Sequence, residues 1–113
     1  MASTGPLGEF EVVILMAVLH LGQAGGDAFG SAIRDEIERR SGRLVPRGSI
    51  YVTLDRLEEK GLLASKLGDT AAGRGGRPKR IFRVTPAGKK AVKHSVAVVT
   101  RMHAGLEPIL GER

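Results

Sequence analysis

Apolar residues recur along the chain with a helical period in four segments and with a strand-like alternation in two. The first helix is predicted to open at residues 7–10, to run to about Leu21 and to end at Gly22. Its residues 11–19 are apolar nearly all round, and a helix of that kind must be covered on more than one side. Two explanations remain open: either a partner chain covers part of it, or it is the central core helix of a single chain.

A second helix is predicted over residues 28–40, with Asp27 as its N-cap and Ser41-Gly42 at its end. Gly30 lies in its first turn, where glycine lowers the helix propensity. A close approach by another backbone would explain this glycine, and so would an ordinary glycine at a helix start.

The chain is organised around the stretch from Pro46 to Gly61, which predicts a third helix with two different faces. One stripe is apolar and is expected to be buried; it consists of Ile50, Leu54 and Leu57. The neighbouring stripe begins with small and polar residues and consists of Ser49, Thr53 and Arg56. A helix that offers hydroxyls and cations in its N-terminal half fits a recognition helix in a DNA major groove, where the first turns meet bases and phosphates.

After Gly61 the period changes to the alternation of strands, which are predicted over residues 62–67 and 79–85. The glycine-rich segment between them carries Arg74 and Arg77, so the three pieces predict a β-hairpin wing. Such a loop does not suit a nucleotide, because nucleotide-binding loops follow a strand and open a helix. Beside DNA, its arginines can enter the minor groove or pair with phosphates.

A final helix is predicted from Ala87 towards Leu110, about 36 Å long, with Thr85 as N-cap and Pro86 as its first residue. Apolar positions follow a coiled-coil-like 4-3-4-3 spacing along one edge. Little within one domain can cover that edge, so it is expected to pair with the same helix, or with the apolar first helix, of a second subunit. The residues predicted to form the dimer interface are Val13, Met16, Ala17, Val92, Val96, Val99, His103 and Leu106.

The charge distribution favours a polyanion as partner. Between Arg43 and Arg83 there are ten Lys or Arg and four Asp or Glu, and 10 − 4 equals the whole net charge of +6. The flanks hold equal numbers of each sign and cancel. A central basic excess is expected of a protein that binds nucleic acid, although a solvated basic face would give the same count.

Composition excludes several other classes. The 113 residues leave room for one domain, and the chain contains no cysteine, so disulfides and thiolate zinc ligands are excluded. Without cysteine, with scattered acids and with His20, His94 and His103 apart, no nucleophile–base pair is evident and we expect neither an enzyme, a metal site nor a cofactor. No signal peptide is visible and the apolar run of the first helix is too short for a bilayer, which predicts a cytoplasmic protein without a membrane partner.

The element order predicts a mainly α fold with a small β-hairpin, a winged helix-turn-helix over residues 8–86. A flexible leader over residues 1–7 precedes it, and a dimerisation helix over 87–113 follows. The sequence resembles the PadR family of bacterial transcription regulators, specifically its short members with a single C-terminal helix. The resemblance covers about residues 7 to 95 and rests on Leu7–Glu11, Phe29–Ile33, Arg47–Leu62 and Gly76–Gly88. Phe29 departs from it, because the family usually has tyrosine there.

The resemblance implies a homodimer that binds double-stranded DNA at a pseudo-palindromic operator, usually as a repressor. By this resemblance Tyr51 would donate its hydroxyl to a phosphate, whereas the alternative places its ring on the core. Arg56 would either contact DNA or pair with Glu59 or Asp55. The residues predicted to contact DNA are Arg47, Ser49, Tyr51, Thr53, Arg56, Arg74, Arg77 and Lys79.

Two further expectations concern partners. Many PadR-like proteins respond to planar small molecules at the dimer interface, but without tryptophan this chain offers a flat effector no obvious platform. The alternative to a DNA-binding regulator is a winged-helix interaction module that binds an acidic protein partner.

Overall fold

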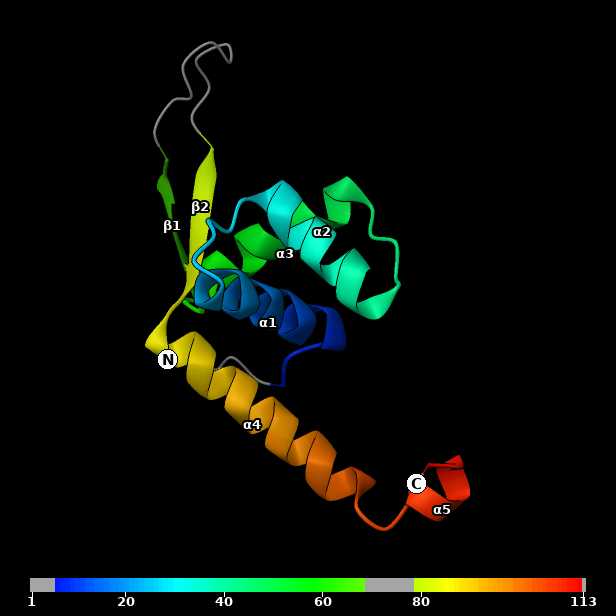
Figure 1. Cartoon of the computed structure of the whole chain (residues 1–113). Helices are drawn as coiled ribbons and strands as arrows, with labels where there is room; N and C mark the ends of the chain where they lie inside the picture. The colour runs from blue at the N-terminus through cyan, green and yellow to red at the C-terminus, as the bar shows by residue number, and fades with distance from the viewer. Residues whose placement is uncertain (1–5, 69–78, 113) are drawn as a thin grey trace.

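The computed structural model describes residues 6–68 and 79–112, which form five α-helices and a two-stranded antiparallel sheet (Figure 1). In chain order the elements are α1 (Glu9–Gln23), α2 (Gly30–Ser41), α3 (Arg47–Glu59), β1 (Leu63–Leu67), β2 (Arg80–Val84), α4 (Pro86–His103) and α5 (Glu107–Leu110). The predicted mainly α winged helix with one small hairpin is confirmed. Arg74 and Arg77 lie outside the described residues.

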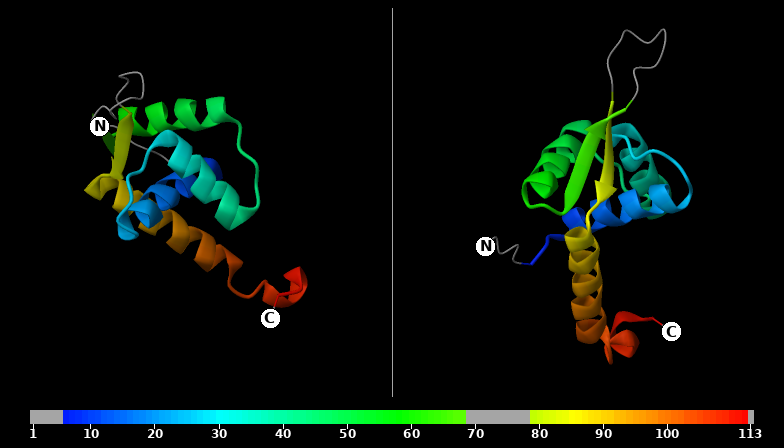
Figure 2. Two further views of the ribbon diagram at one scale, coloured as in Figure 1. Left: turned by 45° about the horizontal axis from the view of Figure 1, so that its top comes forward. Right: turned by 90° about the vertical axis from the view of Figure 1, so that its left-hand side faces the viewer.

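Helix α1 is the central element of the fold. It contacts α2, α3, β2 and α4, and the views of Figure 2 show it between the α2–α3 pair and α4. Its neighbours bury Ile14, Leu15, Ala17 and Val18. Elements of the same chain therefore cover much of its apolar surface, while Val13 and Met16 stay half-buried.

This position corrects two expectations about α1. Ala17 is only 4% exposed inside its own chain, so it cannot contribute to a dimer interface as predicted, whereas Val13 and Met16 remain half-buried. The helix also continues through Gly22 to Gln23, because Gly22 keeps a negative φ and the Ala24 amide still donates a hydrogen bond to the His20 carbonyl at 3.1 Å.

The start of α2 differs from its prediction. Asp27 is not the N-cap: α2 begins at Gly30, and Phe29 precedes it in extended conformation without a side-chain cap. A long-range hydrogen bond explains the late start. The Ala28 carbonyl accepts from the Phe82 amide of β2 at 3.0 Å, so it does not accept the hydrogen bond that a helix over Ala28 would require. At the other end Gly42, with a φ of 72°, closes α2 as predicted.

The hairpin has the predicted faces. β1 pairs with β2 in a register from Leu63 opposite Val84 to Leu67 opposite Arg80. Phe82 and Val84 are buried, whereas Ile81 and Arg83 lie on the other face because side chains alternate along a strand. The sheet thus contributes one apolar face to the core.

Helix α4 begins as predicted, but it ends earlier. The Thr85 hydroxyl accepts a hydrogen bond from the Gly88 amide at 3.0 Å and donates one to the Gly61 carbonyl at 2.7 Å. The helix stops at His103, because Ala104 leaves helical conformation and Gly105 has a φ of 89°. Its 18 residues span about 27 Å rather than 36 Å, and α5 follows as a separate short turn.

The chain covers only the beginning of α4. Val92 is 9% exposed and belongs to the core, whereas Val96 and Val99 are 42% and 67% exposed. Met102, Leu106 and Ile109 continue this uncovered apolar surface. Among the described residues, no helix is both long and apolar enough to cross a membrane.

Candidate nucleic-acid interface

The buried stripe of α3 fixes which side of the helix faces outward. Ile50, Leu54 and Leu57 are at most 1% exposed, which confirms the predicted apolar stripe. They pack α3 against α1, α2 and β1. The opposite side is exposed and carries Arg47, Gly48, Ser49, Val52, Asp55, Arg56 and Glu59.

Thr53 does not lie on this exposed side. It is only 6% exposed, and together with Phe10 of α1 it lines a hollow beside the start of α3. The reason is helical geometry, because Thr53 stands one turn before the buried Leu57. Its predicted contact with DNA is therefore wrong, whereas Ser49 one turn earlier is exposed as predicted.

Tyr51 lies at the edge of the exposed face, 42% exposed, with its ring against the first turn of α2. A Cβ at Gly30 would come within 2.6 Å of Cε1, Cζ and Oη of this ring. A side chain, and not another backbone, therefore explains the glycine. The Tyr51 hydroxyl makes no hydrogen bond within the described part of the chain, so it is available to a ligand.

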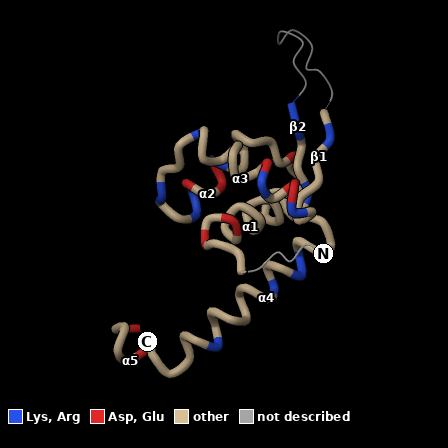
Figure 3. Tube along the Cα trace, turned by 180° about the vertical axis from the view of Figure 1, so that it is seen from behind, with Lys and Arg blue, Asp and Glu red and all other residues tan. Residues whose placement is uncertain are grey.

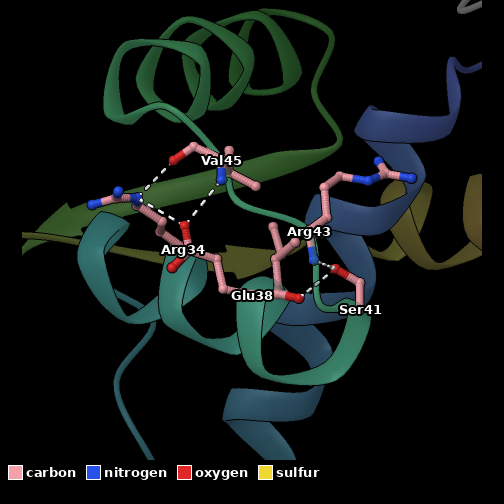
Figure 4. Close-up of polar contacts among 6 residues, drawn as sticks. Arg34, Glu38, Ser41, Arg43 and Val45 are labelled. Atoms are coloured by element: carbon pink, nitrogen blue, oxygen red, sulfur yellow. Dashed lines mark hydrogen bonds and ion pairs between the residues drawn. The ribbon is translucent and has the colours of Figure 1, made fainter.

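The turn between α2 and α3 is held by side chains of α2 (Figure 4). Arg34 Nε donates a hydrogen bond to the Val45 carbonyl at 2.7 Å, and the Val45 amide donates one to Glu38 Oε2 at 2.9 Å. Arg34 and Glu38 also pair with each other at 3.3 Å, and the Arg43 amide donates to the Ser41 hydroxyl at 3.1 Å. These contacts set where α3 begins.

Sequence reasoning missed this role of Arg34 and Glu38. Their i,i+4 spacing was a visible signal. The contact with Val45 could not be read from it, because that contact depends on the path of the turn.

An ion pair joins the hairpin to α3 and changes the charge of the site. Arg80 of β2 donates to Asp55 Oδ1 at 2.9 Å and to Glu58 Oε1 at 2.5 Å. The hydrogen bond to Asp55, with that to Glu58, raises the pKa of Arg80. Asp55 and Glu58, two acids of α3 whose charge would repel phosphate, therefore share Arg80 as a counter-charge. Asp55 is engaged by Arg80 instead of Arg56, which makes no ion pair with any described residue.

Not every cation of the central segment is free. Lys60 pairs with Glu11 at 2.8 Å, and Arg43 pairs with Glu9 at 3.1 Å. Within the described ranges, the cations of this segment without an ion pair are Arg47, Arg56, Lys66, Lys79 and Arg83. They lie on α3 and on or beside the hairpin strands, and Figure 3 marks the charged positions of both elements.

Lys79 has a further contact that the sequence did not suggest. Its Nζ lies 5.2 Å from the centre of the Phe29 ring, just before α2. A cation over an aromatic face is attracted by the ring quadrupole. Phe29, which departs from the tyrosine of the family pattern, thus steadies the chain directly before β2, beside α2.

The hollow beside α3 has a volume of about 570 Å³. Its lining is mainly apolar and consists of Phe10, Arg43, Leu44, Val45, Pro46, Gly48, Ser49, Val52 and Thr53. This volume lies within the range of small-molecule sites. Within residues 6–68 and 79–112, no group of three or more His, Cys, Asp or Glu is placed to hold a metal ion.

Comparisons with known proteins agree on one family. The model of the transcriptional regulator PadR-like family matches residues 18–94. The transcriptional regulator Rv3488 of Mycobacterium tuberculosis is 35% identical over 85 residues, which are 74% of this chain and 74% of that protein.

Two solved structures show the same fold. A PadR family transcription regulator from hypervirulent Clostridium difficile R20291 superposes with a TM-score of 0.72 at 19% identity, covering 91% of this chain and 99% of that chain. The PadR-like transcriptional regulator BC4206 of Bacillus cereus gives a TM-score of 0.67 at 17% identity, covering 92% of this chain and 93% of that chain.

Proposed function

Because the chain belongs to the PadR-like family of transcriptional regulators, which bind DNA, we propose that it acts as a homodimeric repressor on a pseudo-palindromic operator. One observation carries the proposal. The exposed polar face of α3 lies on one side of α1, and the uncovered apolar edge of α4 lies on the other (Figure 1). Neither surface would hinder the other, so two chains can join through α4 while each keeps α3 free for DNA.

The DNA-reading surface combines α3 with the hairpin. Arg47, Ser49 and the Tyr51 hydroxyl lie in the first half of α3, where a recognition helix meets base edges and phosphates. Lys79, directly before β2, adds a cation from the hairpin. Thr53 is not part of the proposed surface, because it is buried.

The proposed dimer interface is the apolar edge of α4. Val96 and Val99 are exposed, and Leu106 after the end of the helix is 42% exposed. Large apolar side chains that gather on one edge mark an interaction surface. A second copy is the economical partner, because symmetric pairing of the same edge covers it on both chains at once. Val13 and Met16 of α1 are half-buried, so part of each side chain stays available to the proposed interface.

The function is tested by measuring association and sequence preference on the same protein. Sedimentation velocity should give a dimer, and selection from a pool of random duplexes should enrich an inverted repeat. Affinity should fall at least tenfold over a few-fold rise in salt, because phosphate contacts release counterions.

Neutralising Arg74 and Arg77 together should lower the slope of log affinity against log salt concentration by about one to two units. A monomer, or duplex binding without sequence preference and without a steep salt dependence, would contradict the proposal and favour an acidic protein partner.

We include control by a small apolar molecule in the proposed function, with the hollow beside α3 as its site. A ligand there would touch Phe10, Ser49 and Val52, and the last two lie on the exposed face of α3. Phe10 supplies the aromatic contact that the sequence did not reveal. A thermal-shift screen of small aromatic compounds should find ligands that release the duplex and lose their effect in Leu44→Asp, since Leu44 lines the hollow and is 83% exposed.

A further inference from the structure

Val52 is an apolar side chain at the middle of the exposed face of α3. It is 58% exposed and does not belong to the core. A β-branched residue also loses rotamer freedom in a helix, so an exposed valine gives α3 no local advantage. Neither packing nor helix propensity accounts for valine at this position.

The neighbours of Val52 on α3 leave it accessible to another surface. Gly48, one turn before it, has no side chain, and nothing lies within 4 Å of the position where a Cβ would be. On that side the backbone of α3 can therefore approach another surface closely. Arg56, one turn after Val52, is exposed and makes no ion pair with any described residue. Val52 thus stands between an open backbone and a free cation.

The neighbouring acid does not keep DNA away from this point. Asp55, three residues after Val52, is held by Arg80 at 2.9 Å, and the same guanidinium holds Glu58. Val52 lies at the edge of the apolar hollow, with Arg56 one turn after it and Arg47 near the start of the same helix, two cations that make no ion pair with any described residue. A purely apolar protein surface would leave these cations desolvated without partners, which is costly. A polyanion that carries one apolar group can pair with the cations and also contact the apolar Val52 side chain.

The base edges of the DNA major groove offer one such group, the C5-methyl of thymine. Resting on the proposed operator binding, we propose that Val52 is a specificity-determining residue that packs its γ-methyls against a thymine methyl. The contact selects a T·A pair at one position of each half-site. The phosphates on either side are held by Arg47 and Arg56.

The test removes the methyl from each side of the contact separately. The duplex enriched by wild-type protein is resynthesised with each thymine replaced in turn by deoxyuridine, which lacks only the C5-methyl. Burial of one methyl supports about a fourfold difference in affinity, so replacement at one thymine position should weaken binding about fourfold. Val52→Ala should bind the thymine duplex about as weakly, and should lose the difference between thymine and uracil at that position. The other thymines serve as internal controls.

Two protein variants complete the design. Val98→Ala is the matched control, because Val98 is a 38% exposed valine of α4, two residues from Val96 and so on nearly the opposite face of that helix, and α4 lies away from α3 (Figure 1). It should keep both the affinity and the uracil effect. Val52→Thr keeps one γ-methyl and should keep part of the effect. Circular dichroism and thermal unfolding should be unchanged in Val52→Ala, because this side chain lies outside the core.

The outcomes separate this inference from the proposed function. A specific duplex whose affinity is the same with uracil at every position overturns the role of Val52 and leaves operator binding in place. An unchanged uracil effect in Val52→Ala overturns it as well, since another side chain then contacts the methyl. Failure to enrich any duplex overturns both the proposed function and this inference.

Discussion

The ring of Tyr51 lies directly on Gly30, so close that a Cβ at that glycine would come within 2.6 Å of three ring atoms. One residue belongs to α3 and the other to the first turn of α2, so this contact fixes the spacing of the two helices of the DNA-binding motif. It also fixes the Tyr51 side chain, whose hydroxyl remains without a hydrogen-bond partner in the described part of the chain. The contact links helix packing to DNA binding.

Tyr51→Phe should keep the fold and weaken operator binding. The phenylalanine ring still covers Gly30, so the melting temperature should hardly change. Loss of a hydrogen bond to a charged phosphate typically costs about 1.5–3 kcal/mol, or roughly ten- to a hundredfold in affinity. Fluorescence anisotropy on the selected duplex measures this. An unchanged affinity would show that the hydroxyl contacts no phosphate.

Gly30→Ala should impair both stability and binding. The added methyl pushes the Tyr51 ring away from α2, and overpacking of this kind costs about 1–3 kcal/mol. In a Tyr51→Ala background the same change should cost much less, because the ring is no longer there. Urea unfolding of the four proteins of this double-mutant cycle gives the coupling. Additive effects would mean that the ring does not constrain Gly30.

Gly88→Ala should destabilise the protein by about 1–3 kcal/mol, at the upper end of that range. A Cβ at this position would lie 2.2 Å from the Leu62 carbonyl oxygen, and the backbone of the loop before β1 cannot easily move away. Gly22→Ala is the matched control, since it also lies in a helix but nothing stands within 4 Å of its Cβ position. This control should be neutral, or stabilising by up to about 1 kcal/mol. Equal destabilisation of both variants would contradict the predicted clash.

Glu11 should make the fold sensitive to acid. Burial raises the pKa of its carboxyl, but hydrogen bonds from Lys60 and the Gly8 amide outweigh burial and hold the pKa below the ordinary value of 4.5. The unfolded chain then takes up the proton first as the pH falls. The free energy of unfolding contributed by this group is therefore present above about pH 4.5 and is lost as the pH falls towards the lowered pKa.

Urea unfolding as a function of pH checks this expectation. Glu11→Gln should have a lower free energy of unfolding than wild type at pH 7, and the difference between the two proteins should shrink in acid. Glu59→Gln is the matched control, because Glu59 is exposed and makes no ion pair within the described residues. Its stability should follow the wild-type curve. A gap for Glu11→Gln that stays constant from neutral to acid pH would contradict the predicted role.

Val96→Glu should split the proposed dimer without unfolding the chain. Val96 is 42% exposed, so a carboxylate there stays hydrated in the separate chain but becomes buried when two α4 edges meet. His94→Glu is the control, since two residues along a helix place it on nearly the opposite face. Sedimentation velocity should give a monomer for Val96→Glu and a dimer for His94→Glu. A dimeric Val96→Glu protein would show that α4 pairs through another edge.

The sequence by itself determined the order of the elements and the apolar face of each. The stripe of α3, the buried face of β2 and the Thr85 cap all follow from local periodicity and from side chains acting on their own backbone, so they could be read without a fold. The same holds for glycine at the end of α2, because a positive φ is a property of one residue.

Only the tertiary structure decided what covers each face. It buries Thr53 and Ala17, ties Ala28 to β2 so that α2 starts late, and turns Arg80 onto Asp55, which lies 25 residues earlier. Period and spacing say which residues share a side of an element. They do not say which distant element lies against that side, because packing and long-range ion pairs depend on the path of the whole chain.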